Sequence, residues 1–124
     1  MDLDFYDKEG AVEKVITARI GPGGDFHEEV QRLIEKYDIQ YGYIPSAIGM
    51  FEKCTLGIMG ENMEYSERDF DNVEYMLNGS IFQREGKPFV HVHATVGGVG
   101  NDAFVGHLAK GKIKVMCEIT IVFA

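Results

Sequence analysis

The clearest alternation of hydrophobic and polar positions runs from Phe89 to Val96. Residues two apart in a strand point to the same face, roughly 6–7 Å apart along it. The even positions of this run are all valine or alanine and would form a core face. His91 and His93 would stand side by side on the opposite face. The pattern therefore predicts a half-buried strand that presents two imidazoles.

Other runs predict further strands. The residues from 112 to 123 alternate very regularly, and they would present Ile113, Val115, Cys117, Ile119, Ile121 and Phe123 on one face. Ala11 to Ile20 is rich in β-branched residues, and the glycine-rich stretch 21–24 ends it. Shorter strands are expected over 41–51, 54–59 and 66–82, separated by a turn at Glu52-Lys53 and a hairpin-like break at residues 60–62. The segment 66–82 also fits a helical spacing, but Asn78-Gly79 favours a strand with a bend.

One segment has the spacing of an amphipathic helix. From residue 25 to 37 the apolar side chains fall on a single stripe, made of Phe26, Val30, Leu33, Ile34 and Tyr37. Asp25 is placed as the N-cap, and Glu28 three residues later completes a variant of the capping box. Together the elements predict an α+β domain, with a mostly antiparallel sheet of about six or seven strands covered by at least one helix.

The length and composition indicate a single domain. A chain of 124 residues with 45% hydrophobic and 26% charged residues can bury a core without disulfide bonds. We expect an acidic lead-in over residues 1–10 and one domain over 11–124. The apolar runs are too short to span a membrane, and the N-terminus lacks a secretory pattern, so a cytoplasmic location is expected. Cys54 and Cys117 lie in strand-like runs, where buried free thiols are expected, although a pairing between them stays open.

The charge balance changes the expected partners. The chain has 12 basic and 20 acidic residues, a net charge of −8. This balance argues against a surface for duplex DNA, because affinity for phosphates comes mainly from clustered lysine and arginine. Lys110, Lys112 and Lys114 form a small basic group, which we interpret as a solvated strand face and turn.

The histidines are the candidate chemistry. His107 follows the glycine-rich connection 97–102, which can fold the chain back toward His91 and His93. Three neutral imidazoles, each with nitrogen about 2.0–2.1 Å from the ion, would suit zinc or another divalent transition metal and leave a fourth position open. The alternative is that all three are structural residues of strands and a turn. His27, in the first turn of the helix, is either a fourth ligand or a surface residue, and water is the other candidate for the fourth position.

An enzyme is a second hypothesis. An open position on zinc lowers the pKa of bound water to about 7 and so generates a nucleophile. Glu118 or Asp102 would then act as general base, and Arg19 would hold an anionic substrate. A metal-binding domain without catalysis and a regulatory protein that binds nucleic acid are the other hypotheses.

The ordered motifs resemble the PPC (plants and prokaryotes conserved) domain family, in its stand-alone prokaryotic form. The resemblance rests on Arg19, Gly23-Gly24-Asp25, Ala47-Ile48-Gly49, Leu77-x-Gly79-x-Ile81, Gly86-x-Pro88-x-x-His91-x-His93, Gly106-His107-Leu108, Gly111 and Glu118-Ile119. It implies a sandwich-like domain with a largely antiparallel sheet, assembled as a homotrimer. It also implies a metal site at His91, His93 and His107. Prokaryotic relatives are often described as DNA-binding, and plant relatives carry an AT-hook, whose Arg-Gly-Arg-Pro core this chain lacks.

Overall fold

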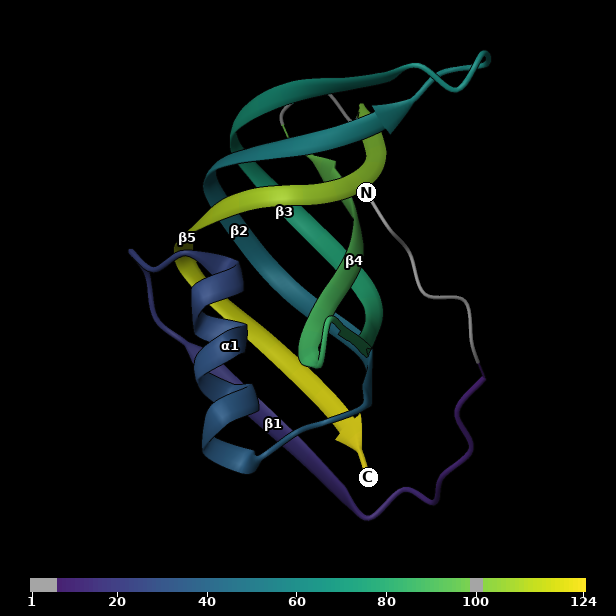
Figure 1. The fold of residues 1–124 in the computed structure, drawn as a ribbon. Helices are drawn as coiled ribbons and strands as arrows, with labels where there is room; N and C mark the ends of the chain where they lie inside the picture. The colour runs from purple at the N-terminus through teal and green to yellow at the C-terminus, as the bar shows by residue number, and fades with distance from the viewer. Residues whose placement is uncertain (1–6, 99–101) are drawn as a thin grey trace.

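The computed structural model describes residues 7–98 and 102–124. This part of the chain forms a five-stranded sheet and one helix (Figure 1). In chain order the elements are β1 (Lys14–Ile20), α1 (Phe26–Tyr37), β2 (Gly42–Met59), β3 (Tyr65–Arg84), β4 (Lys87–Gly97) and β5 (Ala103–Phe123). All the pairings between these strands are antiparallel, which confirms the predicted class of fold. The helix is too short and too polar to cross a membrane.

The prediction of six or seven strands was wrong, because two predicted turns are continuous strand. Lys53 pairs with both Asp71 and Lys112, so β2 runs on through the expected break at Glu52-Lys53. Lys110 pairs with Thr55 within β5, although the sequence around it was expected to turn. Register shifts in the β2–β5 pairing accommodate these residues as bulges, which bend a strand without ending it. The stretch 66–82 is strand as predicted, within β3.

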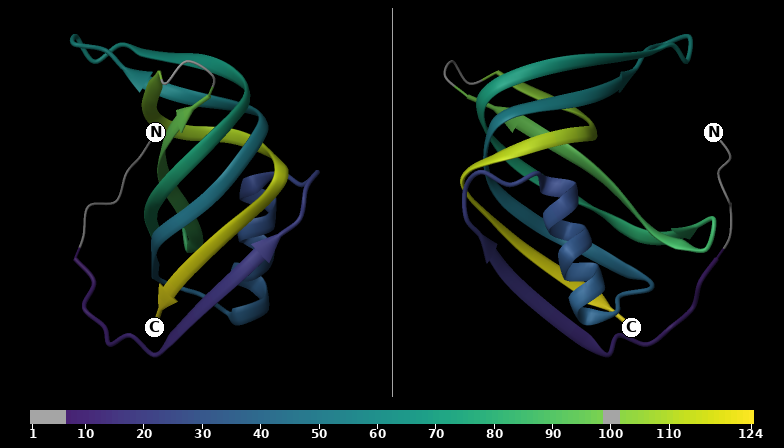
Figure 2. Two further views of the ribbon diagram at one scale, coloured as in Figure 1. Left: turned by 180° about the vertical axis from the view of Figure 1, so that it is seen from behind. Right: turned by 60° about the vertical axis from the view of Figure 1, so that its left-hand side comes forward.

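The sheet curls until one end closes on itself. The order is β1-β5-β2-β3-β4, and β4 pairs again with the first residues of β5. The views in Figures 1 and 2 show the long strands β2, β3 and β5 coiling around one another, with β4 beside them. At the other end β1 extends the sheet, and α1 packs against β5 (Figure 2). The closure brings β4 and β5 into contact at the predicted histidines.

The helix begins where the sequence predicts. The side chain of Asp25 accepts a hydrogen bond of 3.0 Å from the backbone N–H of Glu28, so Asp25 is the N-cap. The helix ends at Asp38, whose backbone is left-handed with φ 51°. Four apolar residues of the predicted stripe are buried against the sheet, namely Phe26, Val30, Leu33 and Ile34, and Tyr37 is exposed.

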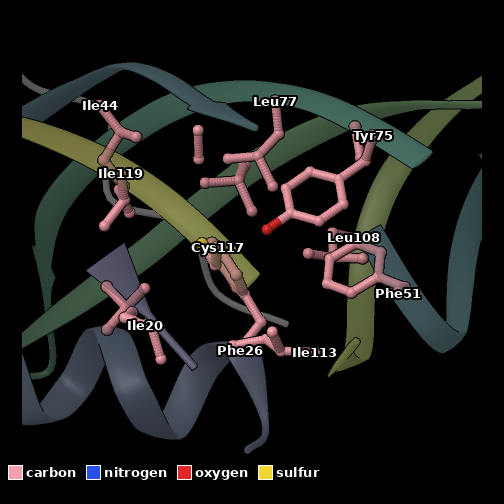
Figure 3. Packing of buried hydrophobic residues seen from close by; sticks show 14 of the residues in the cluster. Ile20, Phe26, Ile44, Phe51, Tyr75, Leu77, Leu108, Ile113, Cys117 and Ile119 are labelled. Carbon is pink, nitrogen blue, oxygen red and sulfur yellow. The ribbon is translucent and has the colours of Figure 1, made fainter. Parts of the chain in front are cut away.

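The core lies between the curled sheet and the helix (Figure 3). Phe51 stacks on Tyr75 with ring centroids 4.1 Å apart, and Phe26 meets Phe51 edge-on at 6.2 Å. The hydroxyl of Tyr75 points toward Cys117 (Figure 3). Cys54 and Cys117 are buried and free, as predicted. Each large apolar side chain that is fully buried contributes about 1.5–3 kcal/mol, so this cluster holds the helix on the sheet.

The last strand differs from its predicted alternation at one position. Val115 has a φ of 64° and a side chain that is 63% exposed, so it does not share the core face. The cause is a bulge in β5. Gly49 of β2 pairs with Cys117, but the next residue, Met50, pairs with Lys114, so Val115 lies within the extra residues of β5. The remaining predicted core residues of β5 are buried. The first strand begins at Lys14 and not at Ala11, and the division into lead-in and domain stays a prediction.

Candidate metal centre

The pairing of β4 with β5 places the three histidines on one face of the sheet. His93 and His107 are direct partners across the two antiparallel strands, and such partners project to the same side. His91 lies two residues before His93 and therefore shares that side. Val92, Ala94 and Val96 are buried on the opposite face, which confirms the predicted alternation. Residues 99–101 of the predicted connection lie outside the described residues.

The three imidazoles converge. Their ring centroids lie 5.1 Å apart for His91 and His93, 5.4 Å for His91 and His107, and 6.2 Å for His93 and His107. One nitrogen from each ring lies within 4.8 Å of the other two. Tetrahedral zinc needs nitrogen atoms about 3.3 Å apart, so ring rotations that bring the nitrogens up to about 1.5 Å closer would complete the set. The three histidines can therefore hold a metal ion.

The surroundings favour the neutral imidazoles that bind metals. Burial lowers the pKa of His91, and the neighbouring His93 lowers it further. Burial also lowers the pKa of His107, with smaller contributions from His91, His93 and His27, while Glu67 acts in the opposite direction. A metal ion competes with protons for the ring nitrogens. Because the pKa of each of these two rings is lowered, each ring is more available to a metal ion than a histidine with an ordinary pKa.

A hollow of about 580 Å³ lies beside the triad. Besides the histidines it is lined by Gly57, Ile58, Met59, Tyr65, Phe89, Val105 and Gly106. Its lining carries no lysine, arginine, aspartate or glutamate among the described residues. The hollow is thus an apolar space that opens next to the three converging imidazoles.

Glycine shapes one wall of this hollow. Gly57 is paired with His107 on one side and with Glu67 on the other. A Cβ at Gly57 would lie 2.6 Å from Cε1 of Tyr65, so the ring of Tyr65 can lie over this position because Gly57 has no side chain. The Tyr65 hydroxyl donates a hydrogen bond of 2.9 Å to Oε2 of Glu67. The ring of Tyr65 thereby forms an aromatic wall over β2, the strand next to the one that carries His107.

The residues that line the hollow beside the histidines were not predicted from the sequence. Phe89 stands two residues before His91, and Val105 stands two residues before His107. The period of a strand could have placed both on the histidine face. Gly57 and Tyr65 come from β2 and β3, and finding them required the pairing of these strands, which the local sequence does not encode.

The residues predicted for catalysis do not join the triad. Arg19 forms an ion pair of 3.0 Å with Glu118, its cross-strand partner between β1 and β5. Asp102 lines a different hollow, with Met76 and Val115. None of these three predicted residues lines the space beside the histidines.

The candidate fourth ligand, His27, and the basic group also lie outside the triad. His27 belongs to α1 and is outside the group of converging nitrogens. Burial lowers its pKa, against a smaller opposing effect of Asp25. Lys112 pairs with Glu52 at 3.0 Å, and Lys114 donates to Oδ1 of Asn72 at 2.7 Å. These two lysines are engaged with surface side chains, and Lys110 is exposed, in agreement with the predicted solvated face.

Two solved structures are close in fold. The metal-containing protein from Archaeoglobus fulgidus is 26% identical with a TM-score of 0.85, and the match covers 96% of this chain and 85% of that one. The plant- and prokaryote-conserved (PPC) protein from Pyrococcus horikoshii also has a TM-score of 0.85, at 23% identity, and covers 96% of this chain and 84% of that one. The second likeness concerns the fold alone.

The sequence also matches curated proteins and a family model. The bifunctional protein GlmU of Synechococcus sp. (strain JA-2-3B'a(2-13)) is 32% identical over an alignment of 101 residues, which covers 79% of this chain. The chain spans about 15% of the length of such curated relatives. The model of the Plants and Prokaryotes Conserved (PCC) domain matches residues 7–123. The chain therefore belongs to the PCC family, which is the PPC family that its motifs resemble.

Proposed function

We propose that this protein is a homotrimeric PPC domain that binds a transition metal, zinc in the first place, through His91, His93 and His107. The observation that carries the proposal is the convergence of the three rings, with one nitrogen of each within 4.8 Å of the others. A histidine pair on a strand is common in proteins without metal. A third imidazole that meets it from another strand is what makes a ligand set.

The donor chemistry supports zinc. Neutral imidazole nitrogen is a preferred ligand of zinc, and three protein ligands with an open fourth position are typical of zinc sites that bind or activate a small molecule. When bound, the ion would supply a Lewis acid at that position. The similar protein from Archaeoglobus fulgidus is described as metal-containing, which agrees with the proposal.

Metal analysis of the untagged protein tests this function. We expect about one equivalent of zinc per chain after gentle purification, because three ligands on rigid strands bind the ion tightly. His93→Ala should lower the content at least about ten-fold, since it removes one of the three ligands. His27→Ala is the matched control and should retain the metal, because His27 lies outside the triad. Less than about a tenth of an equivalent in the unmodified protein would contradict the proposal.

The triad supports metal binding more directly than it supports hydrolysis or DNA binding. A metal-hydroxide mechanism would use a nearby general base, and no carboxylate lines the hollow among the described residues. The net charge of −8 also opposes binding to duplex DNA.

A further inference from the structure

The hollow beside the triad is apolar and of the size of a ligand site. Its volume of about 580 Å³ falls within the roughly 300–1,000 Å³ that small-molecule sites occupy. Tyr65 is 53% exposed and Val105 is 62% exposed, so apolar surface is presented to solvent next to polar ligand nitrogens. Such sites commonly bind molecules that combine an apolar body with a few fixed polar contacts.

From this hollow we infer, on the basis of the metal site proposed above, that the protein binds a small organic monoanion. The ligand has one carboxylate head group, which takes the open position of the metal, and an aromatic or branched aliphatic body, which lies in the hollow.

Charge determines the head group. Three neutral imidazoles leave the charge of a divalent ion uncompensated, so an anion is favoured at the open position. Lysine and arginine are absent from the described lining. A second or third negative charge would therefore be buried against apolar walls without a partner, which is costly. This argues against nucleotides and sugar phosphates and for a single carboxylate.

The walls determine the body. β5 pairs with β2 on one side and with β4 on the other, and β3 lies beyond β2. Tyr65 comes from β3 and Phe89 from β4, so aromatic rings come from both sides of β5. Val105 and Met59 add aliphatic surface. Aromatic and aliphatic walls gain from covering an apolar body in proportion to the area removed from water. A bare acetate ion would leave this surface unused.

Calorimetric titration of the zinc-loaded protein with three probes tests the inference. The probes are 3-phenylpropanoate, acetate and adenosine 5′-monophosphate. We expect 3-phenylpropanoate to bind at least about ten-fold tighter than acetate, because both have the same head group and only the first has an apolar body. Adenosine monophosphate should bind more weakly than 3-phenylpropanoate, since its phosphate has no cationic partner besides the metal.

A pair of tyrosine variants locates the body of the ligand. Tyr65→Ala should remove most of the advantage of 3-phenylpropanoate over acetate while the zinc content stays unchanged. Tyr43→Ala is the matched control, because Tyr43 is also 53% exposed and does not line the hollow. It should leave both affinities as they are.

The outcomes separate the two proposals. A protein without zinc would overturn the metal site and the ligand with it. A zinc-loaded protein that binds acetate as tightly as 3-phenylpropanoate, or adenosine monophosphate more tightly, would overturn the ligand alone. Dissociation of the assembly by Tyr65→Ala would identify this face as a contact between subunits, and that result also contradicts the ligand.

Discussion

At the scale of single residues, the candidate site depends on where each imidazole stands on its strand. His93 is paired with His107 across the two strands, and His91, two residues before His93, lies on the same side of β4. Within the triad, burial lowers the pKa values of His91 and His107. Because a lower pKa keeps a ring neutral to a lower pH, His91 and His107 are available as metal ligands at neutral pH.

Zinc affinity should therefore depend on pH in a defined direction. Between about pH 8 and 7 the rings of His91 and His107 are neutral, and we expect little change in zinc affinity. As the pH falls from about 6.5 to 5, protons compete for the three nitrogens, and the affinity should fall at least about ten-fold. Titration with a zinc indicator at each pH measures this. An affinity that is constant down to about pH 5 would mean that the ligands are not histidines.

The same shifts act on the stability of the metal-free protein. A histidine with a lowered folded pKa binds fewer protons in the folded than in the unfolded state, so its contribution is lost as the pH falls through its ordinary value of 6.5. The metal-free protein should thus be less stable below about pH 6 than at neutral pH. Acid therefore lowers both the stability of the metal-free protein and the zinc affinity.

At the scale of elements, glycines allow the strands to approach one another at the site. Gly79 on β3 is paired with Val92 on β4, between the two histidines of that strand. A Cβ at Gly79 would lie against the carbonyl oxygen of His91 and 2.7 Å from the Cα of Val92. Both atoms belong to the backbone, which cannot turn aside as a flexible side chain can.

Gly79→Ala should consequently displace β4 under the histidines. We expect the free energy of unfolding to fall by about 1–3 kcal/mol, as for other overpacked positions, and zinc affinity to fall with it. Denaturant unfolding and zinc titration measure the two effects. Gly21→Ala is the control, because a Cβ there meets no atom within 4 Å, and it should change neither quantity appreciably. Equal behaviour of the two variants would show that β4 does not depend on Gly79.

The sequence predicted elements well where the signal was local. The alternation of β4, the stripe of α1 and its cap at Asp25 depend on neighbouring residues and were confirmed. Strand ends were harder to predict. Whether Lys53 turns or continues depends on partners on β3 and β5, and the bulge at Val115 arises from the register with β2. Such long-range pairing also determines the walls of the hollow, which were not predicted.

At the scale of the whole molecule, an exposed apolar area suggests how subunits assemble. Ile48, Met76 and Val115 are 45%, 68% and 63% exposed, and they line one hollow of about 620 Å³ on the sheet. Side chains of this kind are normally covered in the native assembly when they gather in one place. If the proposed homotrimer forms, we expect this area to be its subunit interface.

Met76→Lys should weaken the trimer, because it buries a charge in that interface. Light scattering coupled to size-exclusion chromatography should give the mass of three chains for the unmodified protein and a smaller mass for the variant at micromolar concentration. Met63→Lys is the control, since Met63 is 75% exposed in the turn between β2 and β3, and it should stay trimeric. A monomeric unmodified protein would contradict the assignment.

The central claim is that three imidazoles from two strands hold one metal ion. A crystal structure of the zinc-loaded protein, with anomalous scattering measured on both sides of the zinc edge, tests it most directly. We expect one anomalous peak in each subunit, about 2.0–2.1 Å from a nitrogen of His91, His93 and His107. A fully loaded crystal whose peak lies elsewhere, or whose three rings point away from it, would rule out this metal site.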